Sequence, residues 1–215
     1  MPDKMIFTKD ELEEMGKRNV DVLVEAIDAG DLDRAKYLAK RMHQECLAMH
    51  DALIDWITGI LTFVGRRLGY ETLHDAHQEG CRAWIEPLTE IFRGADVRRR
   101  AVVLTKILRG HMMPLSVEED DEKFTFVLDP CGSGGRQIQA GKYEPPRDFL
   151  KIKTAQALSL GRENLPVYCS HHLFEQLIPE EILGYPLFIV KPAEKLGEGP
   201  CRFYLYKDPK KAAKR

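Results

Sequence analysis

Two short segments of the chain combine cysteine, histidine and glycine at spacings suited to a binding or catalytic site. The first, Asp129 to Arg136, reads Asp-Pro-Cys-Gly-Ser-Gly-Gly-Arg, and the second, Tyr168 to His172, reads Tyr-Cys-Ser-His-His. Each follows a run of apolar and β-branched residues typical of a strand. Thiolates and imidazoles are ligands that zinc prefers in proteins. We therefore expect one site built from both segments, around a metal.

The spacing suggests a role for each thiol and imidazole. Cys169 and His172 are three residues apart, which is the knuckle spacing of zinc sites, and Cys131 would add a second thiolate. Three protein ligands leave a fourth position for water or substrate, as catalytic zinc requires. If His171 also binds the metal, the closed shell indicates a structural site instead. Buried thiols that hold no metal are the remaining alternative.

The glycine-rich part of the first segment predicts an anion-binding loop or a glycine-rich hairpin turn. Gly132, Gly134 and Gly135 around Ser133 permit a close backbone approach, so consecutive N–H groups could form a nest for an anion. Arg136 could hold a carboxylate through two parallel hydrogen bonds. The run lacks both the Gly-Lys-Ser/Thr ending of a nucleotide phosphate loop and the dinucleotide spacing, which disfavours nucleotide binding.

Histidines and cysteines also share faces of predicted helices. Two clusters have this spacing: His43, Cys46 and His50, and His74, His77 and Cys81. Each cluster could hold a metal, or it could consist of core cysteines beside surface histidines. His50 precedes Asp51 and lies within two turns of Trp56. We therefore include His50 as a catalytic candidate and Trp56 as a substrate-binding candidate, facing a pocket between the two halves of the chain.

The first half of the chain is predicted to be helical. Thr8 to Glu11 fits a capping box, and Asp31 can cap the next helix. Apolar residues at helical spacing predict helices from Thr8 to about 30, from about 70 to 92 with a kink at Pro87, and from about 96 to 109. The stretch from Asp31 to about 65 or 69 is predicted to be one long helix or two with a break. These helices are expected to form a bundle over residues 1–114.

Residues 115–215 are predicted to form a mixed region, either as a second domain or as part of one domain with the bundle. Strands are expected at 123–128, 165–168, 185–190 and 201–206, the last with Cys201 in the core, and helices at 149–160 and 174–177. Glu118 to Glu122 is expected to be a solvated loop, and residues 207–215 a solvated tail. The predicted fold class is α+β: an N-terminal helical bundle followed by a small, mostly antiparallel sheet region with short helices.

Composition describes an ordinary water-soluble chain. The 215 residues are 44% hydrophobic and 31% charged with a formal net charge of −2, so nothing attracts nucleic acid or anionic lipid to the whole molecule. The longest apolar run, Ile54 to Val64, is too short to span a bilayer. An odd count of five cysteines fits a reducing cytoplasm. The methionine-rich and aromatic stripes could pack against a second copy, giving a homo-oligomer.

Several of these segments resemble the L-2-amino-thiazoline-4-carboxylic acid hydrolase-like family. The similar stretches are residues 119–124, 129–136 and 168–172, with the helical stretches around Asp55-Trp56 and from Arg67 to Glu71. The resemblance covers about residues 48–172, and its most specific part is Cys-Gly-Ser-Gly-Gly-Arg. The second family motif often reads Cys-x-His-Cys, so His172 stands in place of a cysteine.

The resemblance implies hydrolysis of a carbon–nitrogen bond in a small carboxylate-bearing cyclic amidine or amide. A zinc ion on Cys131, Cys169 and His172 would supply hydroxide, and His171 would shuttle the proton. Arg136 and the glycine-loop N–H groups would hold the substrate carboxylate. Two alternatives stay open. Cys131 or Cys169 could be a covalent nucleophile activated by His171 without metal. The protein could also be a non-catalytic small-molecule sensor with a structural metal.

Overall fold

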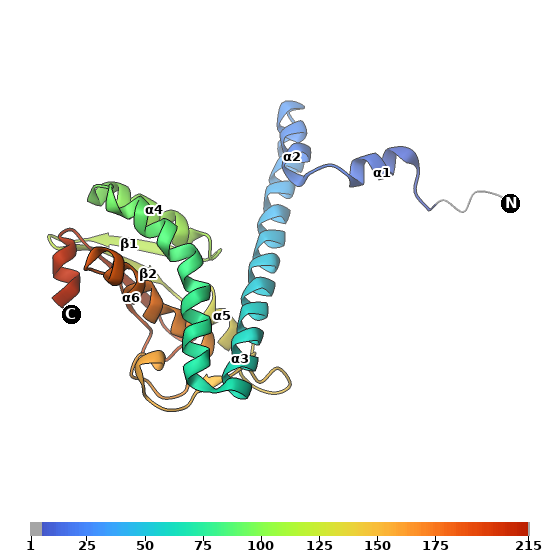
Figure 1. The fold of residues 1–215 in the computed structure, drawn as a ribbon. Coiled ribbons are helices and arrows are strands. Elements are labelled where there is room, and N and C mark those ends of the chain that lie inside the picture. Colours follow the sequence, from blue (N-terminus) through green and yellow to red (C-terminus); the bar gives the residue numbers. More distant parts are fainter. Residues whose placement is uncertain (1–5, 215) are drawn as a thin grey trace. The chain divides into compact units, whose positions relative to one another are not determined.

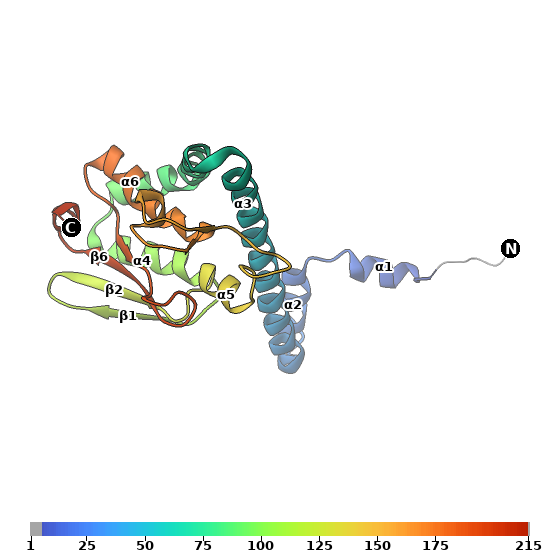
Figure 2. The same cartoon turned by 90° about the horizontal axis from the view of Figure 1, so that it is seen from below.

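The computed structural model describes residues 6–214, which divide into two compact units (Figures 1 and 2). One unit ends at Met49 and the other begins at His50. The predicted boundary at residue 114 therefore separates helices from strands along the sequence, but it does not separate the compact units. The candidate site lies entirely in the second unit.

The first unit is helical, and its helix boundaries follow from capping. In α1 (Lys9–Met15) the Thr8 hydroxyl accepts from the Glu11 N–H at 3.2 Å and Glu11 reaches back to the Thr8 N–H at 2.7 Å, which confirms the capping box. The single helix predicted up to residue 30 is wrong, because α1 stops at Gly16 and α2 (Asn19–Asp28) is separate. Asp31 caps the next helix through the Arg34 N–H at 3.0 Å.

The long helix α3 (Leu32–Arg93) is interrupted at the predicted glycine. Gly69 has φ 86°, a left-handed conformation that glycine adopts without strain, and the helix resumes at Tyr70. The second part runs through Pro87 to Arg93. An 18-residue stretch of α3 has a mean hydropathy of 1.4, enough by length and composition to cross a membrane, although core helices of soluble proteins pass the same test. Helix α4 (Val97–Arg109) follows close to its predicted bounds, and Asp96 caps it.

The second unit contains a four-stranded antiparallel sheet, which confirms the α+β class. Its strands are β1 (Leu115–Glu119), β2 (Lys123–Leu128), β5 (Ile189–Lys191) and β6 (Cys201–Tyr206), in the order β1-β2-β6-β5. Phe126 of β2 lies opposite Phe203 of β6. The loop predicted from Glu118 is wrong at its start. Glu118 and Glu119 are exposed residues of the edge strand β1, which the turn at Asp120 pairs with β2.

One face of this sheet carries the main core. Side chains of α4 and of the second part of α3 pack on it, as the position of α4 along the strands in Figure 1 illustrates. Completely or almost completely buried members are Phe92, Leu104, Leu108, Phe126, Leu128 and Leu205. A second cluster joins α3 to α6 (His171–Leu183) through Leu73, Ile85, Phe174 and Ile178. Alternation along β2 explains why its even-numbered side chains face this core.

The segments that carry the site differ from the prediction. Helix α5 (Gly134–Gln139) begins inside the glycine-rich run, so the hairpin turn is wrong. The helix predicted at 149–160 is also wrong, because β3 (Lys151–Ile152) pairs with β4 (Leu165–Pro166) there, followed by a 3-10 turn at Ala157–Ser159. Figure 2 shows α5 between the sheet and α3.

The second segment and the C-terminal residues also differ from the prediction. Val167–Ser170 is a 3-10 turn where the prediction placed strand, and it leads directly into α6 (His171–Leu183), which runs on through Pro179. The predicted tail is partly folded: Lys207 bridges to Glu119 at 2.7 Å, and residues 209–214 form a 3-10 helix with Ala212 buried. Arg215 lies outside the described residues.

Candidate functional site

A cavity of about 480 Å³ lies between both parts of α3, α4, the sheet and α6. Most of its wall is apolar, from aliphatic and aromatic side chains of these elements. Its polar wall residues are His77, Cys81, His111, Cys131, Ser133, Tyr168, His171, His172 and Glu175. A closed-in apolar volume with a few convergent polar groups is the usual form of a small-molecule site. Five of these polar residues come from the two sequence segments.

Cys131 is buried on the wall of this cavity in an environment that favours its thiolate. The Cys201 thiol donates toward it and lowers its pKa well below the usual range, and although burial opposes this, the Ser133 hydroxyl and the Ser133 and Gly135 N–H groups lower it further. The Cys131 Sγ lies 3.4 Å from the Ser133 Oγ. The backbone nest predicted for a substrate anion is therefore occupied by the protein's own sulfur.

The other buried thiols are held in the protonated form. Burial raises the pKa of Cys169 far above the usual range, and it raises the pKa of Cys81 to about 12. Donation to Cys131, with burial, raises the pKa of Cys201 as well. Among the buried cysteines of the described chain, Cys131 alone is poised as a nucleophile.

His172 and Glu175 form a buried ion pair on the first turn of α6. The His172 Nδ1 lies 2.6 Å from the Glu175 Oε2. Burial alone would lower the pKa of His172, but the Glu175 carboxylate outweighs it and raises that pKa. Burial alone would raise the pKa of Glu175, but the neighbouring His172 and His171 outweigh it and lower that pKa. The pair therefore favours a protonated imidazole held by a carboxylate.

His171 has the opposite character. Its Nδ1–H donates to the Tyr168 carbonyl at 2.6 Å, which leaves Nε2 as an acceptor, 3.8 Å from the Glu175 Oε1. Burial and the neighbouring His172 lower the pKa of His171 to about 4. His171 is therefore neutral near pH 7 and can accept a proton only weakly. A proton shuttle must both take up and release a proton near the working pH, so this lowered pKa does not support the predicted role of His171.

Two groupings of metal-binding side chains are relevant to the predicted zinc site. Within residues 6–214, ligand atoms of three such residues meet within 4.8 Å of one another only at His171, His172 and Glu175. The predicted ligands Cys131, Cys169 and His172 do not gather that closely, but with Cys201 they line a separate void of about 10 Å³. Zinc on either set remains a proposal.

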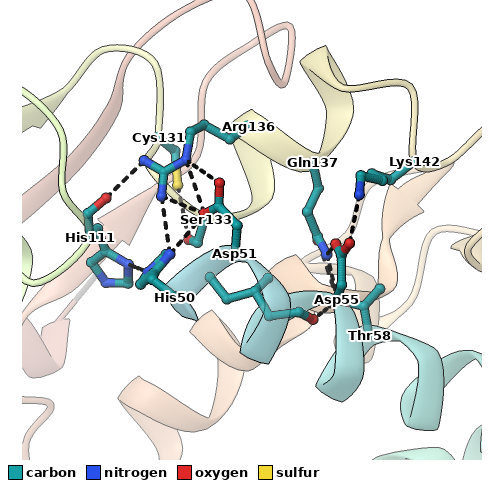
Figure 3. Close-up of polar contacts among 11 residues, drawn as sticks. His50, Asp51, Asp55, Thr58, His111, Cys131, Ser133, Arg136, Gln137 and Lys142 are labelled. Atoms are coloured by element: carbon teal, nitrogen blue, oxygen red, sulfur yellow. Dashed lines mark hydrogen bonds and ion pairs between the residues drawn. The ribbon is translucent and has the colours of Figure 1, made fainter. Parts of the chain in front are cut away.

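Arg136 is bound to the protein rather than free for a substrate. Its Nη2 donates to the Asp51 Oδ1 at 2.7 Å and lies 3.0 Å from the His50 Nδ1, while Nη1 donates to the His111 carbonyl at 2.8 Å (Figure 3). The carboxylate that Arg136 holds is therefore that of Asp51. This arrangement does not support the predicted role of Arg136 as a clamp for a substrate carboxylate.

The same face of α3 holds α5 through a second polar group. The Gln137 amide donates to the Thr58 hydroxyl at 2.9 Å and to the Asp55 carboxylate at 3.0 Å, and Lys142 bridges to Asp55 at 2.6 Å (Figure 3). These bonds fix α5, and with it the Cys131 loop, against α3.

His50 and Trp56 do not join the cavity. The His50 Nε2 lies 3.2 Å from the His111 Nδ1, so His50 contacts the site only through the His111 ring, which does line the cavity. Trp56 is 67% exposed and borders a different surface groove with Phe149. The two histidine and cysteine clusters predicted on the helices have different environments. His77 is buried and bonds the Ser170 hydroxyl at 2.9 Å. His43 and Cys46 are exposed in the first unit.

The three glycines are explained by packing. A Cβ on Gly132 would lie 2.5 Å from the His111 carbonyl oxygen, and one on Gly134 would lie 2.6 Å from the Cys169 Sγ. A Cβ on Gly135 would meet the Cys131 Cβ at 3.2 Å. Glycine is needed here so that α5, the two thiols and His111 can approach one another. The predicted substrate-binding role is not required to account for them.

Sequence reasoning missed Glu175 and His111. Glu175 follows His172 by three residues and His171 by four, a spacing that places the three side chains together only if they share a helix. Starting that helix at residue 174 concealed the relation. His111 sits just after α4, and nothing in its surroundings along the chain marks it.

Comparison with known proteins adds no further identification: no family model, curated protein or solved structure matches the chain. The proposals below therefore rest on the site itself and, for the substrate class alone, on the resemblance of the two motifs.

Proposed function

We propose that the protein is a hydrolase that uses Cys131 as its nucleophile on a carbon–nitrogen bond of a small molecule. The observation that carries this proposal is the Cys131 sulfur on the wall of the cavity, surrounded by hydrogen-bond donors that favour the thiolate. The buried pair of His172 and Glu175 lines the same cavity. A thiolate and a carboxylate-oriented imidazole that face the same cavity are the groups that thiol hydrolases use.

The groups suit a two-step reaction. The Cys131 thiolate attacks the electrophilic carbon, the carbon–nitrogen bond breaks, and protonated His172 gives its proton to the departing nitrogen. Water then attacks the enzyme-bound carbon, neutral His172 takes a proton from that water, and the bond to sulfur breaks. This returns the thiolate and the imidazolium. Glu175 holds His172 in the required orientation throughout.

The cavity indicates the substrate class. Its volume is typical of a small-molecule site, and its walls are mainly apolar, so a substrate with an apolar body and one polar reacting group fits. The family resemblance supports a cyclic amidine or amide. Because Arg136 holds Asp51, a substrate carboxylate is not part of the proposal.

The test compares two thiols in the same protein. Hydrolysis of L-2-amino-thiazoline-4-carboxylate and of neutral cyclic amidines and amides is measured by mass spectrometry of the products. Cys131→Ser should lower the rate by at least about 10³-fold, since loss of a nucleophile removes the whole covalent route. Cys169→Ser, with folding checked by circular dichroism, is the matched control and should keep most activity. Equal losses in both variants would refute the proposal.

A second candidate function is metal-dependent and rests on Cys131, Cys169, Cys201 and His172, which line one void, although their ligand atoms would have to move closer together to share an ion. Three thiolates and one imidazole form a typical zinc ligand set. With all four bound, the site is structural and the protein is a small-molecule sensor. With Cys201 unbound, the zinc ion would supply hydroxide for hydrolysis. Elemental analysis distinguishes the candidates: bound zinc that is lost in both Cys131→Ala and Cys169→Ala favours this one, and metal-free active protein excludes it.

A further inference from the structure

One side of α3 exposes a row of apolar side chains. Leu53, Trp56, Ile60 and Phe63 are 46%, 67%, 50% and 62% exposed, and we refer to these four residues as the α3 seam. The opposite side of the same turns is buried in the core, as Thr58 shows with no exposure. A helix that is apolar on two opposite sides needs a partner on each of them. Within the described residues of the second unit, no helix covers the seam.

The spacing of the seam indicates what kind of partner covers it. Its residues are separated by three, four and three positions, which is the a/d alternation of a heptad. Along the sequence the same alternation continues backward through Met49, Cys46 and Met42. Such an alternation keeps one narrow apolar strip facing a neighbouring helix over several turns. The seam therefore fits a helix rather than an irregular protein surface.

A groove runs beside the seam. Trp56, Ile60 and Phe63 form one wall, Arg147 and Phe149 form the other, and the volume is about 390 Å³. Protruding aromatic side chains next to a groove of this kind make a surface that can fit a rotated copy of itself. Self-complementary patches are the basis of two-fold dimers.

We propose that the α3 seam is the interface with a second copy of this chain, whose α3 lies antiparallel and crosses at Thr58. That crossing point places Trp56 opposite Ile60 of the second copy, and Leu53 opposite Phe63. Each layer then pairs an a position with a d position, as antiparallel coiled coils require, and each sets a larger side chain against a smaller one. The small residue Gly59 beside the crossing allows the helices to approach closely.

A membrane is the competing occupant, because α3 passes the length and composition test for a span. The same turns of α3, however, carry the Asp55–Lys142 ion pair and the buried bond between Thr58 and Gln137. A bilayer would have to displace these contacts and take up charged groups, which is costly. A protein helix covers the seam and leaves them intact.

The interface also lies against the candidate site. Ile60 borders both the groove and the cavity, and Ile57 beside it lines the cavity as well. The second copy therefore packs on the outer side of a cavity wall. The proposal does not depend on the chemistry proposed for Cys131, and its test reads association rather than activity.

Sedimentation equilibrium of the full chain tests the proposal. The chain should dimerise in the micromolar range, and Trp56→Glu and Ile60→Lys should each raise the dimer dissociation constant at least about 30-fold, as for central interface residues. Leu68→Lys is the matched control, since Leu68 is an exposed apolar residue of α3 outside the seam and its dimer should persist. A wild-type monomer, unchanged seam variants, or a monomer that binds lipid vesicles through the seam would overturn the proposal.

Cross-linking tests the antiparallel arrangement. Two chains of different mass, one with Leu53→Cys and one with Phe63→Cys, are mixed and oxidised, both with Cys46→Ser to remove the exposed native thiol. The antiparallel pairing predicts mixed disulfides between the two chains. Disulfides only between identical chains would show a parallel pairing and would overturn the crossing at Thr58.

Discussion

Replacement of Gly132 by alanine tests how tightly the Cys131 loop is packed. The added Cβ would lie 2.5 Å from the His111 carbonyl oxygen, 2.7 Å from the Met113 Sδ and 2.8 Å from the Arg136 Nη1. Ordinary contact begins near 3.4 Å, so the backbone oxygen must retreat by about 0.9 Å. That same oxygen accepts from Arg136 at 2.8 Å, so its movement also disturbs the bond to α5.

We expect Gly132→Ala to lower the free energy of unfolding by about 1–3 kcal/mol, the usual cost of overpacking. Gly80→Ala is the matched control: Gly80 lies inside α3 and an added Cβ meets nothing within 4 Å. This control should gain about 0.5–1 kcal/mol because alanine is the better helix former. Urea unfolding followed by circular dichroism measures both. A Gly132→Ala variant within about 0.5 kcal/mol of wild type would refute the packing account.

Further predictions concern acid stability, the core and the α3–α5 link. Burial lowers the pKa of His77 to about 3 and, with His172, the pKa of His171 to about 4, whereas unfolded imidazoles titrate near 6.5. The unfolded state therefore binds more protons below pH 6.5, so the free energy of unfolding should fall as the pH drops from 6.5 to 4, by up to about 1.4 kcal/mol per pH unit for each group. In urea titrations the free energy of unfolding of His77→Gln should fall less steeply over this range. Phe126→Ala, at a fully buried position, should cost about 3–5 kcal/mol in the same assay, and a cost below 1 kcal/mol would contradict the assigned core. Asp51→Asn should cost about 1 kcal/mol through the weakened bond to Arg136, a loss that is absent when Arg136 is already replaced by methionine.

Local sequence signals predicted the α+β class and the helices that form α3 and α4. The capping residues Thr8, Asp31 and Asp96 and the break at Gly69 act within a few residues of the chain, so their effect can be read from the sequence. The edge strand β1 was not predicted because its acidic residues are stabilised by pairing with β2, which is a tertiary contact.

The sequence predicted which residues belong to the site, but not which residues each of them contacts. Cys131, His171 and His172 line one cavity, and Cys169 lines a separate void with Cys131 and His172, so the two motifs do meet as predicted. The partner of each group could not be predicted, because these partners come from distant segments. Asp51 reaches Arg136 across 85 positions, and the environment of Cys131 depends on Cys201 from the last strand. A contact across such a separation leaves no local pattern.

The reactivity of Cys131 toward iodoacetamide as a function of pH, measured by mass spectrometry of each cysteine peptide, tests the central claim most directly. The exposed Cys46 in the same sample is the internal reference. The account predicts that Cys131 reacts half-maximally at a pH below the ordinary thiol value near 8.5, while Cys169 stays unmodified until the protein unfolds. A Cys131 thiol that reacts with the ordinary pH profile, or later than Cys169, would contradict it.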